Sequence, residues 1–188
     1  MKVTAILLAA GQSHRMGRDK LLLDYQGKSL LRHSLDLLSN LPVHEHIVIT
    51  SQARSESLII PTCLRLCINR NPEKGLSESI KIGVNAASGT HYLFMTADQP
   101  KLRLSDLMQL LYAAESNKDK IIFPIVDFKP TTPTIFPESF RKELLALTGD
   151  TGGREIRDAN PGSCMELMPE NPMNFTDIDR EEEYHDLF

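Results

Sequence analysis

An apolar run followed at once by a glycine-bearing, cationic loop constrains this chain more than any other stretch. Residues 3–10 form an apolar segment with the length and continuity of a strand buried on both faces. Gly11 and Gly17 come next, six positions apart, and three basic residues stand within 11–20. Glycine lets the backbone pass close to a ligand, successive N–H groups can form an anion-binding nest, and basic side chains add positive charge. The stretch predicts a polyphosphate-binding loop, with an ordinary solvated strand-to-loop turn as the alternative.

The spacing of this loop differs from the two best-known nucleotide motifs. The Walker A loop has four residues between its glycines and Lys-Ser/Thr after the second, whereas here five residues intervene and Arg18 follows. The Gly-x-Gly-x-x-Gly fingerprint of dinucleotide-binding proteins is also absent. The loop alone therefore leaves both interpretations open.

Composition excludes several classes of protein. The 188 residues fit one domain that can bury a large core. A formal net charge of −4 at pH 7 argues against a protein that coats nucleic acid. No apolar run approaches the roughly 20 residues that cross a bilayer, and the run at 5–10 is too short for a signal peptide. We expect a cytoplasmic protein without nucleic-acid or membrane partners, in which Cys63, Cys67 and Cys164 are buried, reduced thiols.

Strand-like and helix-like segments alternate along the chain. Further strands are expected at 46–50, 64–68, 92–97, 121–125, 134–136 and 165–168. Helices are expected from Ser29 to about 41, in a short stretch that ends by 60, after 75, from Ser105, over 137–147 with Gly149 as its stop, from 152 and from about 181. This alternation predicts right-handed parallel crossovers. We therefore expect an α/β fold in one domain over 1–188, a three-layer α/β/α, Rossmann-like arrangement with a mostly parallel sheet.

Asp98 is the first candidate for chemistry. In parallel sheets ligands bind beyond the carboxyl ends of the strands, so the loop at 11–20 and Asp98, which follows the strand at 92–97, should share one crevice. Mg²⁺ takes oxygen ligands, commonly one or two carboxylates plus the phosphates of a substrate. A turn-capping aspartate is the alternative.

Three further segments could contribute to a site. Asp177-Ile178-Asp179 places two carboxylates on one face of an extended segment, although the acidic run that follows is typical of a solvated surface. The segment 75–79 opens a helix with two hydroxyls, suited to capping or to contacting a base or ribose. The segment 148–154 is either a substrate loop or a tight turn. No catalytic triad or cysteine signature can be assembled, which leaves phosphate handling.

The loop resembles the signature of the MobA-like nucleotidyltransferases, in the form seen in molybdenum cofactor cytidylyltransferases. The matching residues read Leu8-Ala9-Ala10-Gly11-x-Ser13-x-Arg15-Met16-Gly17-x-x-Lys20. The guanylyltransferase branch typically has Gly at the position of Ala10. Further matches are Gly75-Leu76-Ser77-x-Ser79-Ile80-x-x-Gly83, Asp98-Gln99-Pro100, Gly149-Asp150-x-Gly152 and Asp177-Ile178-Asp179. The chain departs from the family at Thr131-Thr132-Pro133, where Gly-His-Pro is common, so the nucleotide half matches better than the acceptor half.

The resemblance implies a Mg²⁺-dependent cytoplasmic transferase. It would move CMP from CTP to the terminal phosphate of molybdopterin cofactor, release pyrophosphate, and pass its product to a molybdenum hydroxylase. A guanylyltransferase that uses GTP, another transferase of the same fold that joins an NTP to a phosphate acceptor, and a non-catalytic cofactor carrier stay open as alternatives.

The resemblance also implies a role for each motif residue. Arg15, Lys20 and Asp98 would be catalytic, and Asp98 and Asp177 would hold Mg²⁺. Lys20 would neutralise the charge that develops as the α-phosphate is attacked. The expected nucleotide-binding residues are Leu8, Ala9, Ala10, Gly11, Ser13, Arg15, Gly17, Lys20, Gly75, Ser77 and Ser79.

Overall fold

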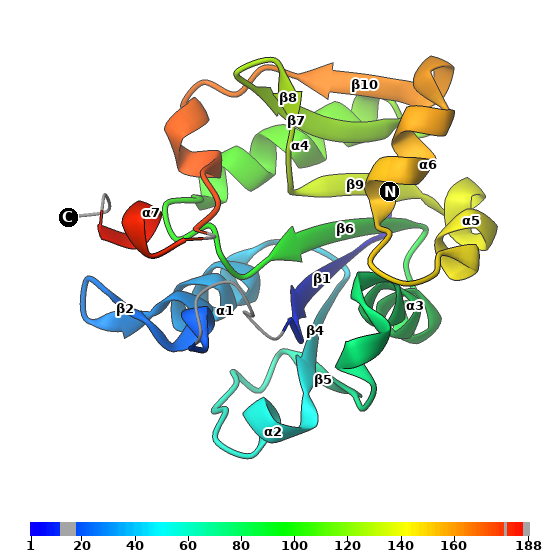
Figure 1. Cartoon of the computed structure of the whole chain (residues 1–188). Helices are drawn as coiled ribbons and strands as arrows, with labels where there is room; N and C mark the ends of the chain where they lie inside the picture. Colours follow the sequence, from blue (N-terminus) through cyan, green and yellow to red (C-terminus); the bar gives the residue numbers. More distant parts are fainter. Residues whose placement is uncertain (12–17, 179, 186–188) are drawn as a thin grey trace.

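A twisted, mostly parallel sheet forms the centre of the molecule (Figure 1). The computed structural model describes residues 1–11, 18–178 and 180–185. The parallel strands β1 (Val3–Ala9), β4 (Glu45–Ser51), β5 (Arg65–Asn69) and β6 (His91–Thr96) lie in the order β6-β1-β4-β5. Beyond β6 come β9 (Thr134–Pro137), β7 (Ile121–Val126) and β10 (Cys164–Leu167), and β9 runs antiparallel to both of its neighbours. The predicted Rossmann-like sheet is confirmed.

Helices cover both faces of this sheet, because successive strand side chains point to opposite sides. Ala5, Leu7 and Ala9 of β1 pack in one buried cluster with side chains from α1 (Leu30–Asn40) and α4 (Leu104–Ser116). Ile6 packs in a second cluster on the other face, formed with α3 (Leu76–Ala86), α5 (Arg141–Ala146) and α6 (Gly153–Ala159). The result is the predicted three-layer α/β/α arrangement (Figure 1).

The segment between β1 and β4 follows the local signals of the sequence. A 3₁₀ turn, η2 (Lys20–Leu22), leads into a small hairpin of β2 (Asp24–Tyr25) and β3 (Lys28–Ser29). Gln26 and Gly27 form its turn with φ of 52° and 81°, as turns of this tight type require. The Ser29 hydroxyl then accepts the Arg32 N–H at 3.2 Å and caps α1 as predicted.

Two helix starts differ from the prediction. The helix expected to be capped by Ser105 begins two residues earlier, with Arg103 at the N-cap, because the Asp106 carboxylate accepts the Arg103 N–H at 2.9 Å and closes the first turn from inside. The helix expected at 137–147 begins later, because Pro137 still belongs to β9 and a 3₁₀ turn, η4 (Glu138–Phe140), precedes α5. Gly149, with φ of 60°, lies three residues beyond α5 in a separate turn and does not stop that helix.

Shorter elements complete the chain. They are α2 (Gln52–Ser55), which ends well before residue 60, η3 (Pro72–Lys74), β8 (Lys129–Pro130), η5 (Pro161–Ser163), η6 (Pro172–Phe175) and α7 (Glu181–His185). The expectation of buried thiols is wrong for Cys63, which is exposed. Cys67 and Cys164 are half-buried, and burial raises the pKa of both. Within the described part of the chain, no helix has the length and apolar character needed to cross a membrane.

Candidate active site

Lys20 and Asp98 meet beyond the carboxyl ends of the central strands. The Lys20 ammonium donates to Asp98 Oδ2 at 2.7 Å and to the Ile178 carbonyl at 2.9 Å. Both side chains are largely buried, with 14% and 17% of their surface exposed. The Ile178 N–H in turn donates to the Asp98 carbonyl at 2.9 Å. Three segments far apart in sequence therefore converge at the edge of the sheet where ligands of α/β proteins bind.

One oxygen of this carboxylate has no partner. Asp98 Oδ1 is buried and accepts no hydrogen bond from any residue that the structure describes. Burying an unpaired carboxylate oxygen is costly, and such atoms in native proteins usually contact an ion or an ordered water. The oxygen is therefore suited to a cation.

The residues around Asp98 fit a hard divalent cation such as Mg²⁺. Asp177 immediately precedes Ile178, whose backbone is bonded to Asp98, and its side chain is exposed. Across residues 1–11, 18–178 and 180–185 there is no group of three or more metal-ligating side chains. A site of one or two carboxylates completed by the phosphates of a substrate is the arrangement typical of Mg²⁺.

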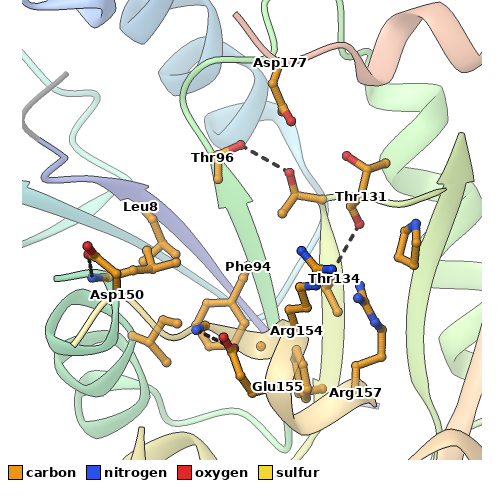
Figure 2. A pocket seen from close by; sticks show the side chains of 17 residues that line it. Leu8, Phe94, Thr96, Thr131, Thr134, Asp150, Arg154, Glu155, Arg157 and Asp177 are labelled. Atoms are coloured by element: carbon orange, nitrogen blue, oxygen red, sulfur yellow. Dashed lines mark hydrogen bonds between the residues drawn. The ribbon is translucent and has the colours of Figure 1, made fainter. Parts of the chain in front are cut away.

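A cavity of about 440 Å³ opens beside this edge (Figure 2). Phe94, Ile80 and Phe136 give it an apolar wall, and Thr96, two residues before Asp98, also lines it. Its volume is in the range that encloses small-molecule ligands. Leu8 of the signature loop also lines it.

Charged side chains stand at opposite ends of the cavity. Figure 2 shows Asp177 at one end, with Arg154 and Arg157 reaching from α6 at the other. The Arg157 guanidinium lies 4.9 Å from the centroid of the Phe123 ring and pairs with Asp158 at 2.9 Å. The hydrogen bond from Arg157 lowers the pKa of Asp158.

The segment 75–79 is held by the turn at 148–151. Gly75 has φ of 88°, and a Cβ there would stand 2.4 Å from the carbonyl carbon of Gly149. The Ser77 N–H donates to the Gly149 carbonyl at 3.1 Å, and the Leu76 N–H donates to Asp150 Oδ1 at 3.3 Å. The turn at 148–151 thus supplies acceptors for N–H groups at the start of α3 that have no partner within the helix. The 148–154 stretch forms a turn that leads into α6, and four of its residues, Asp150, Gly152, Gly153 and Arg154, also line the cavity, so its predicted role as a substrate loop stays a prediction.

The two hydroxyls of this segment lie inside the fold. Ser77 and Ser79 are 2% and 5% exposed, and Ser79 Oγ accepts the side-chain amide of Asn69 at 2.9 Å. Neither hydroxyl caps α3, whose N-cap is Gly75. Their predicted contact with a base or ribose stays a prediction.

The remaining predicted residues are distributed as follows. Ala9 and Ala10 are buried at the end of β1, and Gly11 is exposed. Ser13, Arg15 and Gly17 lie outside the described residues.

Gln99 belongs to the Asp98-Gln99-Pro100 match, but the sequence assigned it no role. Its side-chain nitrogen donates to the carbonyls of Thr132 at 3.1 Å and Phe175 at 3.0 Å, and the residue is 3% exposed. It therefore ties two segments next to the cavity to the strand end that carries Asp98. The signal in the sequence was the position of this amide side chain directly after Asp98.

Comparison with known proteins identifies the family of this chain. Residues 5–164 match the MobA-like NTP transferase domain. The chain belongs to this family. Among curated relatives, a probable molybdenum cofactor guanylyltransferase from Rhodopirellula baltica is 32% identical over 123 residues, which are 62% of this chain and 58% of that protein. The purine catabolism protein PucB of Bacillus subtilis is 28% identical over 95% of this chain and 92% of its own length.

Solved structures agree on the fold. The crystal structure of Rv0371c from Mycobacterium tuberculosis has a TM-score of 0.85 at 22% identity, covering 100% of this chain and 97% of that one. The matches to the first guanylyltransferases cover only 51% to 58% of those proteins. The chain therefore spans little more than half the length of these relatives.

Proposed function

We propose that this nucleotidyltransferase-family protein moves CMP from CTP to the terminal phosphate of molybdopterin cofactor and releases pyrophosphate. The observation that carries the proposal is the Lys20–Asp98 pair, with its unpartnered carboxylate oxygen, at the carboxyl edge of the sheet. It stands beside a cavity large enough for a small-molecule substrate.

The chemistry joins two anions, so positioning and charge neutralisation dominate it. An oxygen of the acceptor phosphate forms a bond to the α-phosphorus of the nucleotide, and the bond to the β-phosphate oxygen breaks. In this proposal the Lys20 ammonium would offset the negative charge that develops at the α-phosphate. No covalent nucleophile is needed.

Asp98 and Asp177 would hold Mg²⁺ in this proposal. The bound ion would neutralise phosphate charge and orient the reacting groups. Support comes from the buried, unpartnered Asp98 Oδ1 and from the backbone bond between Asp98 and Ile178, the residue after Asp177. A structural relative, Rv0371c, is described in complex with manganese.

CTP is the nucleotide expected from Ala10, and GTP is the second candidate. The curated relatives named molybdenum cofactor guanylyltransferases favour GTP. Ala10 is 3% exposed and belongs to the same buried cluster as Ile6 and Ile49. Its methyl group would therefore act on the base by setting the path of the adjoining Gly11 backbone.

The nucleotide is tested by measuring pyrophosphate release with molybdopterin cofactor, Mg²⁺ and each of the four NTPs in turn. We expect the highest kcat/KM with CTP. In Ala10→Gly we expect the ratio of kcat/KM for CTP to kcat/KM for GTP to fall by roughly tenfold, about the discrimination that one methylene supplies. Turnover with GTP alone would show that GTP, and not CTP, is the nucleotide substrate. Turnover with none of the four NTPs would favour a cofactor carrier. A molybdenum hydroxylase remains the proposed recipient of the product.

A further inference from the structure

Arg54 is a buried arginine that contacts three separate points around the loop at 11–20. It lies in α2, directly beyond the carboxyl end of β4, and its side chain is 7% exposed. Its Nε and Nη2 donate to Asp19 Oδ2 at 2.9 and 2.8 Å. Nη2 also donates to the Gly11 carbonyl at 3.0 Å, and Nη1 donates to the Ala9 carbonyl. One guanidinium thus joins the end of β1 to the residue before Lys20.

Asp19 passes this constraint on to Lys20. Its other oxygen, Oδ1, accepts the Leu21 N–H at 3.1 Å and so caps the 3₁₀ turn η2, whose first residue is Lys20. From there the Lys20 ammonium reaches Asp98. The contacts form a continuous sequence from Arg54 through Asp19 and the backbone of η2 to Lys20.

Arginine is suited to this position for a physical reason. Its planar guanidinium presents five N–H donors in a fixed fork, whereas the lysine ammonium is a compact charge with three rotatable donors. A lysine at position 54 would keep the buried charge paired with Asp19 but could not span Ala9, Gly11 and Asp19 with the same geometry. The geometry of the contacts therefore depends on the fork as well as on the charge.

We propose that Arg54 is a positioning residue, which sets the Lys20 ammonium against Asp98 by holding Asp19 to the end of β1. This inference rests on the proposed function in that Lys20 and Asp98 are taken as its working pair. Arg54 itself stands behind Asp19 and contacts neither Lys20 nor Asp98 among its hydrogen bonds within the described residues.

The test uses the full chain with Arg54→Lys, and Asp19→Asn as a second variant. Asp19→Asn retains an acceptor for the Leu21 N–H but loses the charge that pairs with Arg54. Arg32→Lys is the matched control, because Arg32 pairs with Asp36 on the surface, where such pairs contribute little. Two quantities are measured: kcat at saturating substrates, and the rate at which an amine-acetylating reagent modifies Lys20 relative to exposed Lys118, followed by mass spectrometry.

In Arg54→Lys and Asp19→Asn we expect kcat to fall by about tenfold or more, since small misplacements of a positioned group cost up to 10²-fold. We expect labelling of Lys20 relative to Lys118 to rise several-fold in the same variants and to stay unchanged in Arg32→Lys. An unchanged ratio in both variants, or an equal rise at Lys118, would overturn the positioning role. A wild-type protein that turns over no NTP would refute the proposed function, while the labelling ratio would still decide the role of Arg54.

Discussion

Asp98→Asn should lower kcat by roughly 10²–10³-fold while the protein stays folded, in line with the loss of one charge-stabilising group in other enzymes. The change keeps the shape of the side chain and removes its charge. Asp98 Oδ2 is paired with Lys20, and Oδ1 is buried without a partner in the described residues. The variant would therefore lose both the counter-charge that holds Lys20 and the anionic oxygen that we assign to Mg²⁺.

This prediction is checked by steady-state pyrophosphate release, with the midpoint of thermal unfolding recorded for each protein. Asp36→Asn is the control, since Asp36 pairs with Lys28 and Arg32 on the surface of α1. We expect its kcat to stay within about twofold of the wild type, because exposed ion pairs contribute little. Near-wild-type turnover by a folded Asp98→Asn protein would refute the assignment of Asp98. Binding of the cofactor without turnover in the wild type would instead indicate a carrier.

Gly75→Ala should lower the free energy of unfolding by about 2–4 kcal/mol, because it combines a strained backbone with an overpacked contact. Gly75 has φ of 88°, and an added Cβ would stand 2.4 Å from both the carbon and the oxygen of the Gly149 carbonyl and 2.6 Å from Asp150 Oδ1. Two of these atoms are backbone, so the turn at 148–151 must move away from the start of α3. We expect a weaker affinity for nucleotide as well.

Gly27→Ala separates the two causes. Gly27 has φ of 81° but no atom within 4 Å of an added Cβ, so only the backbone penalty of about 1–2 kcal/mol applies. Urea unfolding at 25 °C gives both free energies. Equal losses in the two variants would show that the close approach of Gly75 to Gly149 contributes nothing.

The alternation of apolar runs with helical spacing was enough to predict the layered sheet. Each strand carries its own signal, and the meeting of the loop with Asp98 follows from the geometry of parallel strands, whose carboxyl ends share an edge. The antiparallel direction of β9 carried no such signal, because a short apolar run of this kind is equally compatible with parallel and antiparallel pairing. The early start of α4 came from Asp106 inside the helix, where the prediction had considered only the N-cap position.

The pairing of Arg54 with Asp19 also could not be predicted from local sequence patterns. The two residues are 35 positions apart, and neither belongs to a periodic apolar face. A signal did exist in the topology, since Arg54 follows a parallel strand and therefore lies at the same edge as Lys20. Three predicted residues, Ser13, Arg15 and Gly17, fall outside the described chain, so their roles rest on the family resemblance.

The most direct test of nucleotidyl transfer by this protein is to count both products of one reaction. Purified protein is incubated with CTP, Mg²⁺ and molybdopterin cofactor, and the cofactor mass and the pyrophosphate are measured together. We predict that each cofactor molecule consumed gains one CMP and that one pyrophosphate appears with it. Cofactor that is bound but unchanged in mass, with no pyrophosphate released from CTP or any other NTP, would contradict nucleotidyl transfer by this chain.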